Sequence, residues 1–258
     1  MRINNNIMAM NAHRNLGVNT TRQTKSLEKL SSGLRVNRAA DDAAGLSVSE
    51  KMRAQIKGMK QGARNAQDGI SFIQTAEGAM DEVSAMLTRL KELSVQKASE
   101  TYSTDDIAAI TSEAGQLIGQ ITEIIDNTKF NGINISSEVD IAAGDEDGDI
   151  ITVGVDMSGA AAKSLDAAGF TTANVDDAIT EINSFRSTLG AHQNRLESTV
   201  NNLNTTVENL SSAESRIRDT DMASEMSEFN KQNILVQAAT AMLAQPNQAP
   251  QSVLSLLQ

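Results

Sequence analysis

The chain has 258 residues, enough for one or two domains, and only 2% of them are aromatic, so its core must be built mainly from aliphatic side chains and alanine. A net charge of −11 argues against binding to nucleic acid, because phosphate binding needs clustered Lys and Arg. The absence of cysteine excludes disulfides, thiolate nucleophiles and cysteine-ligated metals.

The first residues have no apolar core of the kind found in signal peptides. No run of about 18 apolar residues occurs anywhere, so we also expect no membrane span. Export, if it occurs, would then use a route other than the general one. Residues 1–60 carry 11 basic and 4 acidic side chains, opposite in sign to the rest of the chain.

An apolar stripe predicts a long helix after residue 42. Asp41 and Asp42 offer the side-chain acceptors wanted at an N-cap, and no proline interrupts the chain before residue 100. Steps of three and four mark one helical face, so we expect a single helix of about 55 residues, about 80 Å long, with a packed partner. The stripe consists of Met52, Ile56, Met59, Ala63, Ala66, Ile70, Ile73, Ala76, Met80, Val83, Leu87 and Leu90.

A second helix is predicted from a capping box at Ser103 to about Asp126. Alternating apolar residues at 139–141 and 151–155, on either side of an acidic turn, then predict a β-hairpin. We expect this hairpin to form the solvated far tip of a rod. Residues 145–149 could also suggest a weak calcium site, but they lack the glycine and closing glutamate of an EF-hand loop.

The carboxy-terminal half repeats the helical stripe and is expected to open at Asn174. Two long stripes far apart in sequence need each other to bury their seams, which predicts an antiparallel helical bundle. The fold class is therefore mainly α: a long antiparallel helical rod or coiled coil with a small β-hairpin. The second stripe consists of Leu189, Leu196, Val200, Leu203, Val207, Leu210 and Ile217.

The two ends differ from the stripes because residues 3–12 and 232–258 carry no charge at all. Their apolar residues find no matching seam in the predicted rod, and ordering each residue costs about 1–2 kcal/mol of backbone entropy. We therefore expect these ends to become buried and ordered between subunits. The residues expected in that inner core are Ile3, Ile7, Met10, Leu235, Met242, Leu243, Val253, Leu254, Leu256 and Leu257.

Sequence motifs in both halves of the chain identify a family. They are LSSGLRVN at 30–37, DDAAGL at 41–46, RNAQDGIS at 64–71, KFNG at 129–132, LGAHQNRL at 189–196 and AQPNQAPQSVLSLL at 244–257. Together they resemble the terminal signatures of bacterial flagellins over roughly residues 1–135 and 175–258. Two departures are Pro246, where the last helix should bend or stop, and Gln258, where the family often has Arg.

The resemblance implies a structural subunit of the hollow helical flagellar filament, secreted and extracellular, with no enzymatic activity and no cofactor. It implies an inner coiled coil of residues 1–40 with 220–258, an outer helical rod of 41–135 with 174–219, and a hairpin tip at 136–173. Some flagellins carry a zinc peptidase, but His13 and His192 are isolated and no His-Glu-x-x-His motif is present.

The resemblance also implies partners. The subunits form a homopolymer, are exported unfolded through the flagellar type III apparatus, bind an export chaperone through the C-terminal region, and meet filament cap and hook-filament junction proteins. Arg89, Leu93 and Glu113 match flagellin residues that pack between protofilaments and that an animal toll-like receptor contacts.

Two alternative functions remain open at this point. A hook-filament junction protein has related ends, although its terminal motifs match less closely. A cytoplasmic coiled-coil adaptor would explain the stripes but would leave the two charge-free termini without a role.

Overall fold

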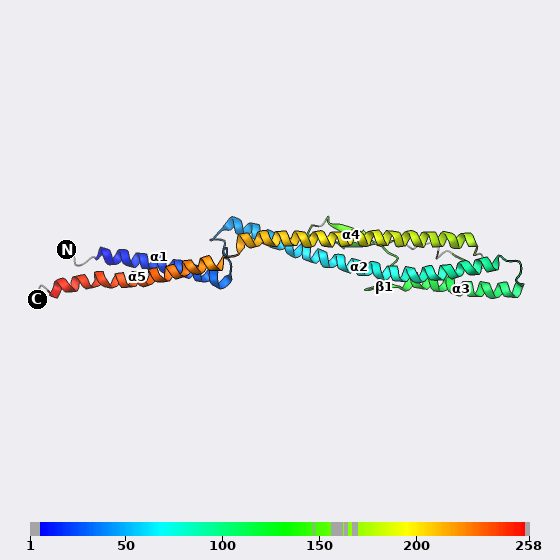
Figure 1. Ribbon diagram of the computed structural model, residues 1–258, viewed down its shortest axis with the longest axis horizontal. Helices are drawn as coiled ribbons and strands as arrows, with labels where there is room; N and C mark the ends of the chain where they lie inside the picture. Colours follow the sequence, from blue (N-terminus) through cyan, green and yellow to red (C-terminus); the bar gives the residue numbers. More distant parts are fainter. Residues whose placement is uncertain (1–5, 147, 156–161, 163–164, 167–169, 256–258) are drawn as a thin grey trace. The chain divides into compact units, whose positions relative to one another are not determined.

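The computed structural model describes residues 6–146, 148–155, 162, 165–166 and 170–255, with the backbone alone over 246–255. Its described part is dominated by helices (Figure 1), which confirms the mainly α fold class. The elements are α1 (Ile7–Ser32), α2 (Ala43–Lys97), α3 (Thr104–Asn127), β1 (Lys129–Phe130), β2 (Ile133–Asn134), β3 (Val139–Ala142), β4 (Ile150–Val153), α4 (Thr172–Arg218) and α5 (Met222–Ser255).

The chain divides into two compact units. The terminal unit comprises residues 1–54 and 210–258, and the central unit comprises residues 55–209. Both boundaries fall inside a long helix, α2 on one side and α4 on the other.

Helix ends follow the local signals of the sequence. Asp42 Oδ1 accepts a hydrogen bond from Gly45 N at 2.8 Å, and Ser103 forms the expected capping box with Asp106. α4, by contrast, begins at Thr172 rather than at Asn174, because the hydroxyl of Thr171 accepts from the Asn174 N–H and caps the helix two residues earlier.

The core of the central unit joins α2, α3 and α4. α2 and α4 run antiparallel, as the ion pairs Lys91–Asp176 and Asp81–Arg186 along their length show. The α2 stripe lies on the buried side as predicted, and Ile73, Met80, Val83, Leu87 and Leu90 are 0% exposed. Phe72 and Phe130 meet edge to face with ring centroids 6.1 Å apart.

Two short antiparallel hairpins complete the central unit. β1 and β2 are joined by Asn131 and Gly132, both with positive φ (49° and 83°), the conformation that a tight two-residue turn requires. β3 pairs with β4 in the register Val139↔Val153 and Ile141↔Ile151, which confirms the predicted hairpin.

The position predicted for the β3–β4 hairpin is wrong. It does not lie at the end of the α2–α3 pair but against α2 between Gly58 and Gly69, where Asn65 Nδ2 donates to Ala142 O at 2.9 Å. The physical reason is a glycine track: at positions 58, 62 and 69 the missing side chain leaves room for the backbone and side chains of residues 141–145. The acidic turn is thus attached to a helix face.

In the terminal unit α1 packs along α5, with the start of α1 and the end of α5 at the same end of the pair (Figure 1). α5 is continuous from Met222 to Ser255, so of the two alternatives expected at Pro246, a bend or a stop, the stop is wrong. A proline removes one backbone donor and costs about 3 kcal/mol, but the flanking turns can keep their own hydrogen bonds.

Candidate assembly surface

The two units bury apolar side chains very differently. Of the hydrophobic residues that are buried in the described part of the chain, Val36 alone belongs to the terminal unit. Most of the large hydrophobic residues that are exposed in the described part belong instead to the terminal unit; Val95, Tyr102, Ile133 and Ile150 belong to the central unit. Those of the terminal unit are Ile7, Met8, Met10, Val18, Leu27, Val48, Met222, Met226, Ile234, Leu235 and Met242.

The seam between α1 and α5 mixes polar and apolar groups. Its members are partly or fully buried positions spaced by alternating threes and fours, as in a coiled coil. They are Ala9, Ala12, Leu16, Asn19, Gln23, Ser26 and Leu30 on α1, and Glu225, Phe229, Gln232, Val236, Ala239 and Leu243 on α5. The two helices therefore pair through small, amide and hydroxyl side chains interspersed with large apolar ones.

Gln232 is the most deeply buried polar residue of this seam, with 2% of its surface exposed. Its Nε2 donates to Glu228 Oε1 at 2.6 Å, while its Oε1 has no hydrogen-bond partner among the described residues. The bond from Gln232, followed by that from Lys231, lowers the pKa of Glu228 below its usual value. An unsatisfied buried acceptor costs about 1–3 kcal/mol, so the pairing is weaker than an apolar seam of the same length.

The residues predicted for the inner core have different positions. Ile7, Met10 and Met242 are 69%, 67% and 61% exposed, and Leu235 is also exposed. Leu243 lies in the α1–α5 seam and is half-buried. Ile3, Leu256 and Leu257, together with the side chains of Val253 and Leu254, lie outside the described residues.

The charge-free ends have a seam partner within the chain, because α1 and α5 pack along each other. Among the residues expected in the inner core, Leu243 lies in this seam. Ile7, Met10, Leu235 and Met242 are exposed and remain available to other molecules.

A junction that the sequence analysis missed connects the base of α1 to the end of α4. Leu34 and Asp219 form an antiparallel bridge, with Arg35 N donating to Arg218 O at 2.6 Å and Thr220 N donating to Gly33 O at 3.0 Å. Gly33 ends α1 in the left-handed region (φ 71°), a helix-ending signal that can be recognised in the sequence. Its partner, more than 180 positions away, has no such signal.

Charged groups reinforce the junction. Arg218 Nη1 lies 2.5 Å from Glu50 Oε1, and Arg35 Nη2 donates to Ile217 O. The hydrogen bond from Arg218 lowers the pKa of Glu50. α1, α2, α4 and α5 are thus tied together where they meet in the terminal unit.

Two of the three residues predicted for a partner contact on α2 and α3 lie together at the surface. Arg89 donates from Nε and Nη2 to Glu113 Oε1, at 3.1 and 2.9 Å, and from Nη1 to Glu92 Oε2 at 2.9 Å. These bonds, that to Glu113 foremost, raise the pKa of Arg89. Leu93 is 1% exposed and belongs to the core, so it is not part of this surface.

Neither a metal-binding cluster nor a membrane-spanning helix is found in the part of the chain that the structure describes. Its His, Asp and Glu side chains form no group able to hold a metal ion, and Asp147 of the acidic turn lies outside the described residues. No described helix is long and apolar enough to cross a membrane.

Comparison with known proteins agrees with this arrangement of two helical ends. The family described as "Bacterial flagellin N-terminal helical region" matches residues 3–139, and "Bacterial flagellin C-terminal helical region" matches residues 172–257. Over the full length of both chains, the sequence is 51% identical to the flagellin of Halalkalibacterium halodurans, 46% to the flagellar filament 33 kDa core protein of Treponema phagedenis and 45% to the flagellin of Bacillus subtilis. The chain therefore belongs to the bacterial flagellin family.

Proposed function

We propose that α1 and α5 are the elements through which this flagellin polymerises. Flagellins are structural subunits that assemble with one another into the flagellar filament, an extracellular structure, and they are not enzymes. The observation that supports the proposal is the distribution of apolar side chains in the terminal unit: many large ones are exposed, while amide side chains take several positions in the α1–α5 seam. Such a surface is unfavourable for a free subunit and favourable once neighbours cover it.

The free energy available is substantial. Fully burying one large aliphatic or Met side chain is worth about 1.5–3 kcal/mol, so covering even half of the exposed apolar residues of α1 and α5 would drive association strongly. We expect residues 1–40 with 220–258 to form the inner part of the filament, 41–135 with 174–219 the outer helical part, and 136–173 a surface hairpin.

Removal of residues 232–258 tests the proposal. The truncated chain should still show a cooperative helical melt by circular dichroism, because the core of the central unit does not include this segment. Sedimentation should show no polymer under conditions where the full chain forms filaments. Filaments from the truncated chain would refute the proposal.

Point variants give a finer test that keeps α5 whole. Ile234→Gln with Met242→Gln removes two exposed apolar side chains from α5 and should raise the critical concentration for polymerisation without changing the melt of the monomer. The matched control is Val95→Gln with Ile150→Gln, which removes two exposed apolar side chains from the central unit. Equal effects of the two pairs would contradict a special role for the terminal helices.

We also propose that the Arg89–Glu113 surface packs between protofilaments and is recognised, on the free subunit, by an animal toll-like receptor. The exposure of both side chains and their double hydrogen bond support this. Arg89→Ala should weaken binding to the receptor ectodomain, while Arg186→Ala, which breaks a comparable surface pair with Asp81, should not. Equal binding by free subunit and intact filament would argue against the shared surface.

Export and the remaining partners are proposed from the family. We infer that the chain leaves the cell unfolded through the flagellar type III apparatus, guided by a chaperone that binds the C-terminal region, and that it meets the filament cap and the hook-filament junction. Support comes from the charge-free carboxy-terminal segment, which offers a chaperone an apolar ligand without competing charges. Secretion that persists in cells without the flagellar export apparatus would refute the route.

A further inference from the structure

One face of α1 is apolar in the middle and basic at its edges. Arg14, Val18, Thr21 and Lys25 are separated by steps of four, three and four, which place them along one side of the helix. At about 100° per residue, this side is opposite to the seam residues such as Leu16. All four residues are exposed.

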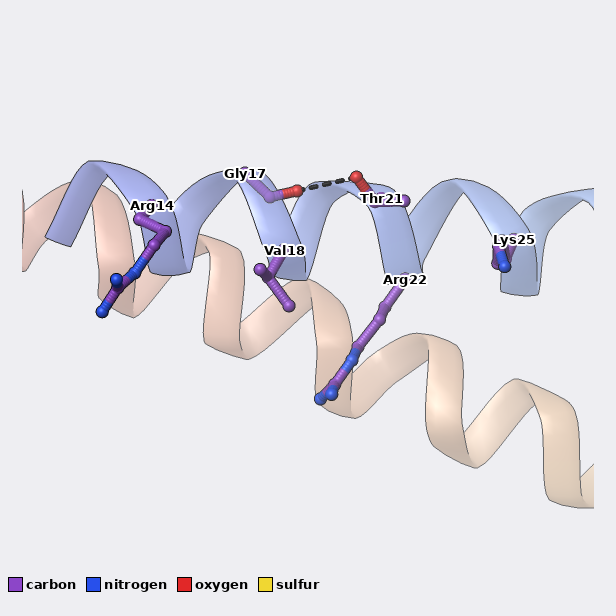
Figure 2. A pocket seen from close by; sticks show the side chains of 6 residues that line it. All are labelled: Arg14, Gly17, Val18, Thr21, Arg22 and Lys25. Carbon is purple, nitrogen blue, oxygen red and sulfur yellow. Dashed lines mark hydrogen bonds between the residues drawn. The ribbon is translucent and has the colours of Figure 1, made fainter. Parts of the chain in front are cut away.

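The face is hollowed as well as charged. An open depression of about 530 Å³ is lined by Arg14, Gly17, Val18, Thr21, Arg22 and Lys25. Figure 2 shows Arg14 and Arg22 extending from α1 on either side of Val18. At Gly17 an added Cβ would meet nothing within 4 Å. The Thr21 hydroxyl donates to Gly17 O at 2.8 Å, so the methyl group of Thr21 is the part of this side chain that is left to contact a partner.

The three cations of this face form no salt bridge within 4.0 Å among the residues that the structure describes, but two of them lie near carboxylates. Arg22 helps to lower the pKa of Glu228 on α5, and Lys25 helps to lower that of Asp41. Arg14 donates to Asn11 Oδ1 at 3.3 Å, and the single acid of α1, Glu28, is paired with Arg38. Because α5 carries no charge from Gln232 onward, the positive potential of the face is only partly compensated, and least so at Arg14.

The chain itself carries the complementary charge. The terminal unit has 12 basic and 9 acidic residues, whereas the central unit has 10 basic and 24 acidic residues. The net charges are thus +3 and −14, so one unit of the molecule attracts the other unit of a neighbouring molecule.

We propose that this face of α1, defined by Arg14, Gly17, Val18, Thr21, Arg22 and Lys25, docks the acidic surface of the central unit of a second copy of this chain. The proposal rests on the polymerisation proposed above and adds an electrostatic contact between unlike units to it. Val18 and Gly17 allow close approach of a neighbouring helix, and the three cations fix its position against carboxylates.

Charge-neutralising variants test the contact. Arg14→Gln, Arg22→Gln and Lys25→Gln together should raise the critical concentration for elongation of preformed filament seeds about tenfold, the sum expected of three exposed ion pairs. Lys51→Gln, Lys57→Gln and Lys60→Gln remove the same charge from α2 and are the matched control. The critical concentration for elongation of the wild-type chain should rise with salt concentration. This salt dependence should become smaller in the Arg14/Arg22/Lys25 variant but not in the Lys51/Lys57/Lys60 variant.

Each outcome has a distinct meaning. Equal effects of the two triple variants, or a loss of monomer stability specific to the α1 variant, would overturn the docking proposal while leaving polymerisation intact. Wild-type chains that form no filament at all would refute the proposed function, and the docking contact with it.

A photo-crosslink identifies the occupant. With p-benzoylphenylalanine in place of Val18, filaments are assembled from a mixture of isotopically light and heavy subunits, irradiated and digested. The proposal predicts crosslinks between light and heavy peptides that join α1 to residues 55–209. Crosslinks confined to one isotope, or directed only to the uncharged segment after residue 231, would overturn it.

Discussion

Replacing Gly62 by alanine is a stringent test of how the β3–β4 hairpin is held on α2. Gly62 lies inside α2 and is buried under the hairpin connection. A Cβ at this position would lie 2.9 Å from the carbonyl carbon of Ala143 and 2.9 Å from Gly144 N. Both are backbone atoms, so the contact cannot be relieved by turning a side chain.

Two opposing effects decide the sign of the change. Alanine in place of a glycine within a helix gains about 1 kcal/mol from helix propensity. Overpacking against backbone costs about 1–3 kcal/mol, and displacement of the hairpin also endangers the hydrogen bond from Asn65 to Ala142, worth about 0.5–1.5 kcal/mol. The losses exceed the gain, so we expect a net decrease of about 1–3 kcal/mol in the free energy of unfolding.

Gly78→Ala is the matched control because Gly78 is also inside α2 but an added Cβ there meets nothing within 4 Å. It should stabilise the protein by about 1 kcal/mol. Urea unfolding followed by circular dichroism gives both values, and hydrogen exchange of the β3 and β4 amides should accelerate in Gly62→Ala alone. If Gly62→Ala is as stable as Gly78→Ala, the glycine track does not hold the hairpin.

Three further predictions concern the core, a helix cap and the junction. Leu87→Ala, at a position with 0% exposure, should lower the free energy of unfolding by about 2–5 kcal/mol in urea titrations. Ser103→Ala should lower the free energy of unfolding by about 1 kcal/mol. The Ser103 hydroxyl and N–H lower the pKa of Asp106 in the folded chain. The stabilisation by this cap is therefore fully present above the unfolded pKa of about 4 and is lost as the pH falls through the lower folded pKa, which a pH series of melts would reveal. Glu50→Gln should weaken the contact with Arg218 and lower the melting temperature slightly at neutral pH but not in acid, since the pKa of Glu50 is also lowered on folding; an equal shift at both pH values would contradict this.

The elements that could be predicted from sequence are those whose signals are local or strictly periodic. The α2 stripe from Met52 to Leu90 lies on the buried side because large apolar residues at steps of three and four admit one helical face only. The capping box at Ser103 and the Asn131-Gly132 turn were predictable because they are complete within a few residues. Each needs no information about a distant partner.

The errors arose where the partner is distant or the pattern is not apolar. The α1–α5 seam has the spacing of a coiled coil, but Asn19, Gln23, Ser26 and Gln232 occupy positions that a search for apolar residues passes over. The hairpin was placed at a tip because its acidic turn suits solvent. The glycines that receive it on α2, at positions 58, 62 and 69, carry no local signal that another segment packs on them.

The exposed apolar residues of the terminal unit and its polar seam have a common physical explanation. A helix pair meant to be stable alone would place its large apolar side chains in the seam, as α2 and α4 do with Leu87, Leu90 and Leu189. α1 and α5 place Ile7, Met10 and Met242 on the outside and bury Gln232 instead. Polar seam residues fix the register of the pair at a cost in stability. The remaining stabilisation must then come from surfaces that only other subunits can cover. This is why assembly of this flagellin should depend on its terminal unit, while the central unit keeps its own core whether or not the chain is polymerised.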